Sequence, residues 1–435
     1  MPCLVAQTLP DTALDTSAVD GQWFDEARFG MFVHWGHSSQ LGCDLSWPMA
    51  GGLQIGGMRS TAVPIDEYHS GADTFCPEPG AAKAWTALAR EAGMRYAVLT
   101  TKHHDGYAMW PTKLTDWSIA RSPYGGDLVG EFVNACRSEG LRVGLYHSLS
   151  DWHHPDYPAL TDADLPYSLG THRRSSPEGW QRYLDVLFGQ VAELLTDYGP
   201  IDVLWFDGQW ERLPDEWRAT ELREHIRSLQ PDCLVNERLP GATDFTTPEQ
   251  FIPPSPPGGR FEVCMTMNDS WGFCPSDTNY KSARSLTHTL IEVAARGGNL
   301  LLNVSPGPDG ALPREQVERL SMVAGWMAGN AAAIHATTPA LEPWQFYGPS
   351  TRRGDTTYLF CLARPYETVT VRGVPVRRIA SVIHVATGTE LTSHARMSVI
   401  DELINSDPYG ELMIALPDDL IDDQATTIAL QIAPS

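Results

Sequence analysis

Short apolar runs alternate with longer amphipathic runs up to about residue 338. The short runs are typical of strands buried on both faces, and the longer runs repeat at a helical period. The strand-like runs lie near residues 29–36, 95–101, 141–148, 201–207, 232–236, 261–266 and 299–304. The helix-like runs lie near residues 80–93, 126–139, 178–198, 215–229, 281–296 and 313–330. This alternation predicts an α/β fold with a parallel sheet, a (β/α)8-like barrel whose eighth strand is irregular or hidden in an insertion.

The pattern changes after about residue 338, where strand-like runs follow one another without helices between them. Short strands separated by turn signals predict an antiparallel β-sandwich. We therefore expect two domains, a catalytic (β/α)8-like barrel over residues 1–338 and a C-terminal β-sandwich over residues 339–435. The strand-like runs of the second domain lie near residues 356–361, 368–371, 379–383, 412–416 and 427–432.

The predicted strand at 201–207 ends abruptly on a carboxylate, Asp207. Trp205 lies two residues earlier, so both side chains point to the same side of the strand. In a (β/α)8 barrel, polar residues at the C-terminal ends of strands carry the chemistry, and an aromatic ring beside a carboxylate suits a sugar. On this segment alone, an Asp that only ends the strand and caps the next loop is an equally good interpretation.

Other predicted strands also end in polar or aromatic residues. His34 ends the first strand, His103 and His104 follow the second, and Tyr146 lies near the end of the third. A single histidine at such a position is more often structural than catalytic. Several strand ends of the same kind would converge on one mouth of the barrel, which favours a shared site.

The charge balance narrows the range of partners. The 435 residues include 54 acidic and 31 basic side chains, for a formal net charge of −23. Nucleic acids and anionic membranes attract basic surfaces, so neither is expected, and no apolar run approaches the length of a membrane span. The N-terminus lacks the pattern of a secretory signal, and the eight cysteines show no metal-binding spacing. Both observations favour a cytoplasmic protein with reduced thiols.

Four blocks of sequence occur in a characteristic order, at Phe32–Gly36, Thr101–Gly106, Trp205–Asp207 and Gly297–Pro306. Over roughly residues 22–338, their order and spacing resemble those of α-L-fucosidases of glycoside hydrolase family 29. The resemblance implies a barrel with a C-terminal β-sandwich, no cofactor, and a fucosylated glycan or glycoside as substrate. It also implies retaining hydrolysis of terminal α-L-fucosyl residues through a covalent glycosyl-enzyme intermediate.

A retaining glycosidase needs two carboxyl groups, one as nucleophile and one as acid/base. Asp207 matches the nucleophile of the resembled family. For the acid/base we expect Glu262, in the strand-like run after the Pro/Gly-rich loop at 253–259, with Asp269 as the alternative. The loop is interpreted either as a lid that positions the acid or as a simple connector. A surface salt bridge is the competing interpretation for Glu262, because Glu is mostly exposed.

The resemblance also implies which residues contact the sugar. A metal site built from these histidines and Asp207 is the alternative, but no HExxH-like pair is present, so no metal is expected. One departure concerns the Glu-Trp-Tyr that the family often has after the first strand. Here Ser46-Trp47-Pro48 is the nearest match, and the family's carboxylate is either missing or replaced by Asp44. The expected sugar-binding residues are His34, Trp47, His103, His104, Tyr146 and Trp205.

Two other functions stay open at this point. One is a catalytically silent carbohydrate-binding relative, and the other is a glycosidase for a related sugar such as an α-L-galactoside. The presence of both Asp207 and Glu262 favours an enzyme over a binding protein. Linkage, aglycone and oligomeric state are left open by the sequence.

Overall fold

The computed structural model describes residues 19–52, 62–165, 167 and 174–434. Its N-terminal part is built on a parallel sheet in the order β5-β4-β3-β2-β1-β7-β6. Neighbouring strands are parallel throughout, as the alternation of strands and helices predicts. The strands are β1 (Phe29–Val33), β2 (Tyr96–Lys102), β3 (Arg142–Ser148), β4 (Val203–Asp207), β5 (Leu234–Val235), β6 (Glu262–Met265) and β7 (Asn299–Val304).

An irregular segment, residues 245–250, fills the space between β5 and β6. Isolated parallel bridges join Asn236 to Phe245 on one side, and Thr246 to Phe261 and Glu249 to Cys264 on the other. The segment therefore closes the barrel in the position of the eighth strand, which the sequence pattern left unplaced. Pro248 lies within it, and proline cannot donate to a ladder, so regular strand pairing is interrupted there.

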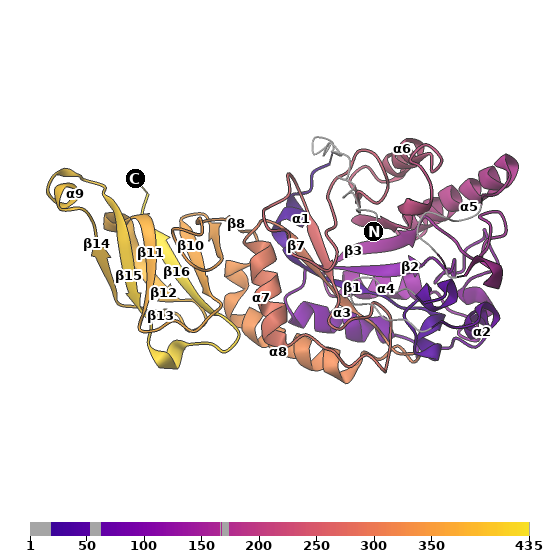
Figure 1. The fold of residues 1–435 in the computed structure, drawn as a ribbon, viewed down its shortest axis with the longest axis horizontal. Helices are drawn as coiled ribbons and strands as arrows, with labels where there is room; N and C mark the ends of the chain where they lie inside the picture. The colour runs from indigo at the N-terminus through magenta and orange to yellow at the C-terminus, as the bar shows by residue number, and fades with distance from the viewer. Residues whose placement is uncertain (1–18, 53–61, 166, 168–173, 435) are drawn as a thin grey trace, which may run out of the picture.

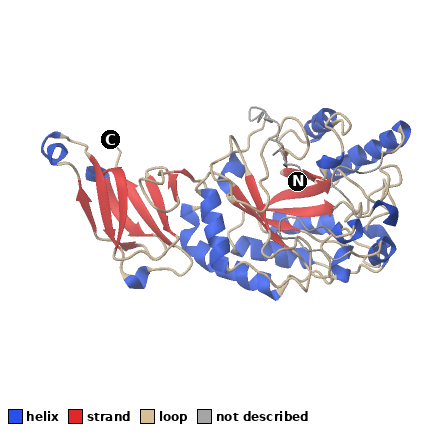
Figure 2. Cartoon of the chain, viewed as in Figure 1, coloured by secondary structure: helices blue, strands red, loops and turns tan. Residues whose placement is uncertain are grey.

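Helices pack around the outside of this sheet, and all six that the sequence predicts are present (Figures 1 and 2). Asp127, Ser176 and Ser282 cap three of them by accepting a backbone N–H of the first turn. The helices are α1 (Gln22–Ala27), α2 (Ile65–Ser70), α3 (Ala81–Glu91), α4 (Leu128–Ser138), α5 (Pro177–Thr196), α6 (Ala219–Leu229), α7 (Ala283–Ala294) and α8 (Arg314–Asn330).

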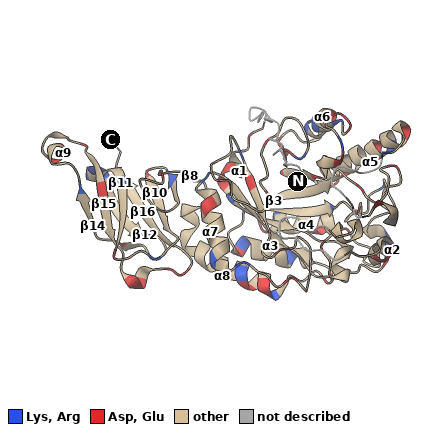
Figure 3. Ribbon diagram, viewed as in Figure 1, with Lys and Arg blue, Asp and Glu red and all other residues tan. Residues whose placement is uncertain are grey.

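The inside of the barrel is filled by side chains from alternate strand positions. Phe32, Val98, Tyr146, Trp205 and Leu301 belong to one buried apolar cluster there. Layers of inward-pointing residues of this kind make a barrel a packed core and leave its chemistry at the strand ends. Most strand residues are uncharged, and the acidic and basic side chains lie mainly on helices and loops (Figure 3).

The C-terminal part is an antiparallel β-sandwich, as the sequence predicts, and it lies beyond α7 and α8 at the end of the elongated molecule (Figure 1). Its six-stranded sheet has the order β13-β12-β16-β10-β9-β8, and its three-stranded sheet has the order β11-β15-β14. The division at residues 338 and 339 stays a prediction. The strands are β8 (Thr338–Pro339), β9 (Ser350–Arg353), β10 (Thr356–Cys361), β11 (Thr368–Pro375), β12 (Ile379–His384), β13 (Thr389–Glu390), β14 (Ser393–Arg396), β15 (Tyr409–Ala415) and β16 (Thr426–Ile432), and α9 (Val399–Ile404) follows β14.

The two parts contact each other through helix residues. The indole N–H of Trp326 in α8 donates to the carbonyl of Ala425 at 2.8 Å, and Thr287 in α7 donates to the side chain of Gln424 at 2.7 Å. Within the described ranges, no helix has both the length and the apolar character that a membrane crossing requires.

Candidate active site

A pocket opens at the C-terminal ends of the barrel strands. Its walls come from most of the strands, from the irregular segment at 245–250 and from loops that follow the strands. The carboxylates of Asp207 and Glu249 and several aromatic rings face the same small space. The residues that line it are Phe32, His34, Trp47, His103, Tyr146, Trp205, Asp207, Trp210, Arg238, Glu249, Cys264 and Trp271.

Asp207, the last residue of β4, is buried on the floor of this pocket. Its Oδ1 accepts from Nη1 of Arg238 at 2.9 Å, and its Oδ2 accepts from the hydroxyl of Tyr146, also at 2.9 Å. Burial alone would raise the pKa of this carboxyl. The positive charge of Arg238 and its hydrogen bond to the carboxylate outweigh that effect and lower the pKa of Asp207 to about 2. Asp207 is therefore an ionised, oriented carboxylate at neutral pH.

Arg238 joins the two carboxylates of the pocket. Its Nη1 binds Asp207, and its Nη2 donates to Oε2 of Glu249 at 2.7 Å. The guanidinium lies over the ring of Trp205, with its central carbon 4.6 Å from the ring centroid. Although burial opposes the charge, both carboxylates raise the pKa of Arg238. A single cation thus holds two acidic groups through two different nitrogens.

The three predicted histidines each have a fixed ring orientation. His34 Nδ1 lies 2.6 Å from Oδ1 of Asn303, and His103 Nδ1 lies 2.5 Å from Oγ of Ser46. Burial and a neighbouring histidine lower the pKa of His34 and of His103 to about 3. Both rings are therefore neutral at pH 7, and a neutral imidazole can donate with one nitrogen and accept with the other.

His104 lies behind the pocket wall, next to Asp207. Its Nδ1 contacts the hydroxyls of Ser148 and Ser150 at 2.6 and 3.0 Å. Its Nε2 has no hydrogen-bond partner among the described residues and lies 3.8 Å from Oδ2 of Asp207. Burial lowers the pKa of His104 to about 4, so it acts on Asp207 as a neutral neighbour.

Aromatic rings form the remaining walls. Tyr146 and Trp205 stack with their centroids 5.5 Å apart, and Trp47 stacks with Trp210 at 6.3 Å. Trp271 faces His34 at a centroid distance of 4.9 Å. Apolar rings combined with a few placed polar groups form a site for a compact molecule that has both apolar and hydrogen-bonding faces, such as a sugar.

Glu262 occupies a different place from the one expected of the acid/base. It is the first residue of β6, at the end of the barrel opposite the pocket, and it is fully buried. Its Oε1 accepts from the indole N–H of Trp205 at 2.9 Å, and its Oε2 accepts from the hydroxyl of Tyr96. The ring of Trp205 separates it from the pocket, so Glu262 cannot reach a substrate bound beside Asp207.

The model of the family described as alpha-L-fucosidase matches residues 7–332 of the chain. The chain belongs to the α-L-fucosidase family. It is 28% identical to the alpha-L-fucosidase of Dictyostelium discoideum, over 81% of this chain and 80% of that protein. It is 29% identical to the tissue alpha-L-fucosidase of Homo sapiens, over 91% and 84% of the two chains. Alpha-L-fucosidase isoenzyme 1 from Paenibacillus thiaminolyticus superposes with a TM-score of 0.81 at 34% identity, covering 95% of this chain and 99% of that one.

Two further expectations about carboxylates in this fucosidase-family chain need correction. Asp44 does not line the pocket. It is buried behind it, where its Oδ1 accepts the backbone N–H of Gly272 at 2.7 Å and so anchors the loop that carries Trp271. Asp269 also lies outside the pocket lining, and its carboxylate accepts from Asn279.

The Pro/Gly-rich loop at 253–259 is a connector. It leads from the pocket end of the irregular segment back to Arg260, whose carbonyl pairs with Thr246 at the opposite end of the barrel. Arg260 there forms an ion pair with Asp25 of α1 at 2.9 Å. The loop therefore leads into the N-terminal end of β6, at the end of the barrel opposite the pocket, and does not cover the site.

The sequence pattern does not identify six of the residues that line the pocket, namely Phe32, Trp210, Arg238, Glu249, Cys264 and Trp271. Trp210 had a signal, since it lies in the loop directly after Asp207, and Trp271 lies two residues after Asp269, the alternative candidate for the acid. Glu249 ends the irregular strand just as Asp207 ends β4. The same strand-end rule would have selected it if the strand itself had been recognised.

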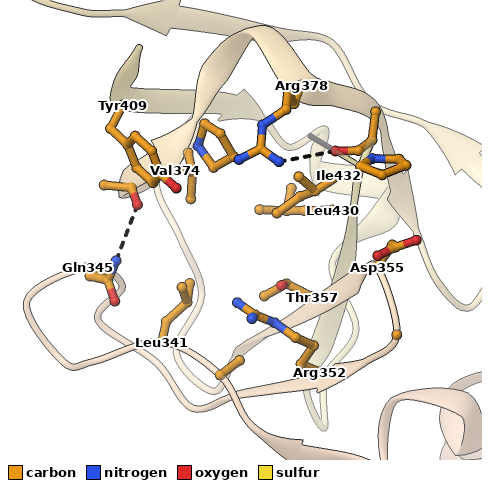
Figure 4. A pocket seen from close by; sticks show the side chains of 16 residues that line it. Leu341, Gln345, Arg352, Asp355, Thr357, Val374, Arg378, Tyr409, Leu430 and Ile432 are labelled. Atoms are coloured by element: carbon orange, nitrogen blue, oxygen red, sulfur yellow. Dashed lines mark hydrogen bonds between the residues drawn. The ribbon is translucent and has the colours of Figure 1, made fainter. Parts of the chain in front are cut away.

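A second cleft lies at the mouth of the β-sandwich (Figure 4). Arg378 lines it but pairs with Asp407 at 3.0 Å, and Gln345 donates to the carbonyls of Arg372 and Gly373. These polar groups are already paired within the domain, whereas the predicted histidines and carboxylates lie at the barrel.

In the described part of the chain, no cluster of three or more His, Cys, Asp or Glu is placed to hold a metal ion.

Proposed function

We propose that the chain is a retaining exo-α-L-fucosidase in which Asp207 is the nucleophile and Glu249 is the acid/base. The observation that carries this assignment is the shared guanidinium of Arg238, which binds Asp207 at 2.9 Å and Glu249 at 2.7 Å. Retaining glycosidases place their two carboxyl groups roughly 5–5.5 Å apart, and a shared guanidinium keeps the carboxylates of Asp207 and Glu249 close together. Glu249 replaces Glu262, which lies behind Trp205.

In the first step, Oδ of Asp207 attacks the anomeric carbon of the fucosyl residue. The glycosidic C–O bond breaks, and Glu249 gives its proton to the departing oxygen. The low pKa of Asp207 supports the role of nucleophile, because the carboxylate stays ionised without a base to activate it. Glu249 is more open to solvent than Asp207, with a third of its side chain exposed, which suits a group that faces the leaving aglycone.

In the second step, Glu249 acts as a base. It takes a proton from water, and the resulting nucleophile attacks the anomeric carbon and releases Asp207. Two inversions give net retention. The contacts from Tyr146 and Arg238 stabilise the carboxylate that leaves, so the intermediate is not a dead end.

Recognition of the sugar is assigned to the neutral histidines and the rings. His34 and His103 present imidazoles held by Asn303 and Ser46, which can bind hydroxyl groups as donor or acceptor. Trp271 offers an apolar surface for the methyl group that distinguishes fucose from galactose. A pocket closed at its floor by Trp205 and Asp207 accepts a terminal residue, which supports exo-cleavage of fucosylated glycans or glycosides.

The test uses aryl α-L-fucosides and the matching α-L-galactosides with the purified chain. We expect faster turnover of the fucoside, and labelling of Asp207 by a 2-deoxy-2-fluoro fucosyl fluoride, detected as a mass increase on its peptide. Labelling of another carboxylate would overturn the assignment of the nucleophile. Sugar binding without turnover of any aryl glycoside would instead favour a silent carbohydrate-binding relative.

A further inference from the structure

Glu262 is a fully buried carboxyl group inside the barrel that the reaction does not use. We propose that Glu262 is a positioning residue, which fixes the indole of Trp205 and through it the groups around the nucleophile. The proposal rests on the function proposed above, since it concerns the same site. It assigns a role to an acid that lies behind the pocket and touches neither substrate nor solvent.

Two hydrogen bonds hold the Glu262 carboxyl group in one orientation. Trp205 donates to Oε1 at 2.9 Å from above, and Tyr96 donates to Oε2 from β2. The Tyr96 ring can lie across the barrel because its neighbour in β1 is Gly30. A Cβ at position 30 would lie only 2.4 Å from Cζ of Tyr96. The small residue at position 30 thus makes room for the ring that orients Glu262.

Trp205 carries this constraint from Glu262 up to the pocket. Its ring is stacked at 22° with Tyr146, whose hydroxyl donates to Asp207. The same ring lies 4.6 Å below the guanidinium of Arg238, which also binds Asp207. Two of the groups that hold the nucleophile therefore rest on a single indole, and the only polar atom of that indole is bound to Glu262.

Burying a carboxyl group in the core of a barrel is energetically unfavourable. Removing such a group from water costs free energy, and an apolar side chain of similar size would avoid this cost. Burial raises the pKa of Glu262 to about 7, while the donors Tyr96 and Trp205 oppose the rise. Fixing the orientation of the indole gives this acid a function that a leucine cannot perform, because leucine offers no acceptor to the N–H.

The experiment is a double-mutant cycle on Glu262 and Trp205, with kcat and KM measured on an aryl α-L-fucoside. Glu262→Gln keeps an acceptor for the indole and should retain activity within about threefold of the unmodified chain. Glu262→Leu should lower kcat by about tenfold or more while KM changes little, because the nucleophile is displaced more than the sugar. Trp205→Phe removes the N–H, so adding Glu262→Leu to it should cost less than about twofold further.

Activity of Glu262→Leu equal to that of the unmodified chain would overturn the proposal. So would independent, multiplicative losses in the double variant, because they would mean that Glu262 does not act through Trp205. If Glu262→Leu does not fold, Trp205→Phe decides alone, since unchanged kcat in that variant contradicts the proposal. If no aryl fucoside is turned over, the proposed function has failed, and calorimetric binding of a fucose-like iminocyclitol replaces kcat in the same cycle.

Discussion

Arg238 donates from Nη1 to Oδ1 of Asp207 across 2.9 Å, at the point where the fourth strand ends. This ion pair lies between two buried side chains, each about 12% exposed, so it is weakly screened by solvent. It keeps the nucleophile ionised and turns one of its oxygens toward the guanidinium, while Tyr146 holds the other.

Replacing Asp207 with Asn should abolish turnover and leave the fold intact. The amide keeps the shape of the side chain but cannot attack the anomeric carbon, so we expect kcat to fall by about a thousandfold or more. The measurement is kcat on an aryl α-L-fucoside together with the thermal midpoint. Asp185→Asn, on an exposed position of α5, is the matched control and should behave as the unmodified chain. Near-native activity of Asp207→Asn would exclude it as the nucleophile.

Replacing Arg238 with Met should move the acid limb of the kcat/KM profile to higher pH. The positive charge lowers the pKa of Asp207 to about 2, so its removal leaves burial to raise that pKa again. The nucleophile is then lost to protonation at a higher pH than in the unmodified chain. A pH profile of kcat/KM from about pH 3 to 8, with stability checked at each point, gives the answer. An unchanged acid limb would show that Arg238 does not control the ionisation of Asp207.

Replacing Asp44 with Asn should improve stability more at high pH than at low pH. Burial raises the pKa of Asp44 to about 7, against the backbone N–H groups of Gly272 and Trp271. A carboxyl group with a raised folded-state pKa gives its full stability below its unfolded pKa near 4 and loses it as pH rises through about 7. The difference in thermal midpoint between Asp44→Asn and the unmodified chain should therefore grow from pH 5 to pH 8. A difference that is constant or shrinks over this range contradicts the expected direction.

Replacing Gly30 with Ala should destabilise the barrel. The new Cβ would lie 2.4 Å from a ring carbon of Tyr96, and overpacking of this kind costs about 1–3 kcal/mol. The denaturation midpoint measures the effect. Gly258→Ala is the control, because a Cβ there meets nothing within 4 Å. Equal midpoints for the two variants would mean that the Tyr96 ring moves aside freely.

Most of the architecture follows from periodicity in the sequence. The seven regular barrel strands, six of the helices and five of the sandwich strands are signalled by the apolar pattern, whereas α1, α2, α9, β8, β9, β13 and β14 are not. The irregular segment at 245–250 is not, because Thr246 and Thr247 break the apolar alternation and Pro248 has no backbone N–H to donate. It is recognisable only from the bridges it makes with neighbours that are themselves distant in the sequence.

The candidate site also contains residues that the sequence pattern predicts and residues that it does not. Asp207 and Trp205 follow from the end of a well-marked strand, and the structure brings them together with the predicted His34, His103 and Tyr146. Glu262 also lies in a well-marked strand, but at its first residue. In a barrel, side chains at the C-terminal end of a strand form the active site, whereas those at its N-terminal end stabilise the fold. The apolar pattern shows where a strand lies, but it does not show which of its residues reaches the pocket.

The central claim is that Asp207 works with Glu249, and rate measurements on leaving groups of different acidity test it most directly. A general acid matters most when the leaving group is poor, so Glu249→Ala should slow an alkyl or natural fucoside far more than an activated aryl fucoside. Azide should restore turnover of the activated substrate, because a small anion attacks the intermediate without help from a base. Glu262→Gln and Asp269→Ala should show neither effect. The account would be contradicted if Glu249→Ala slowed all substrates equally and ignored azide, while Glu262→Gln or Asp269→Ala showed the selective loss and the rescue.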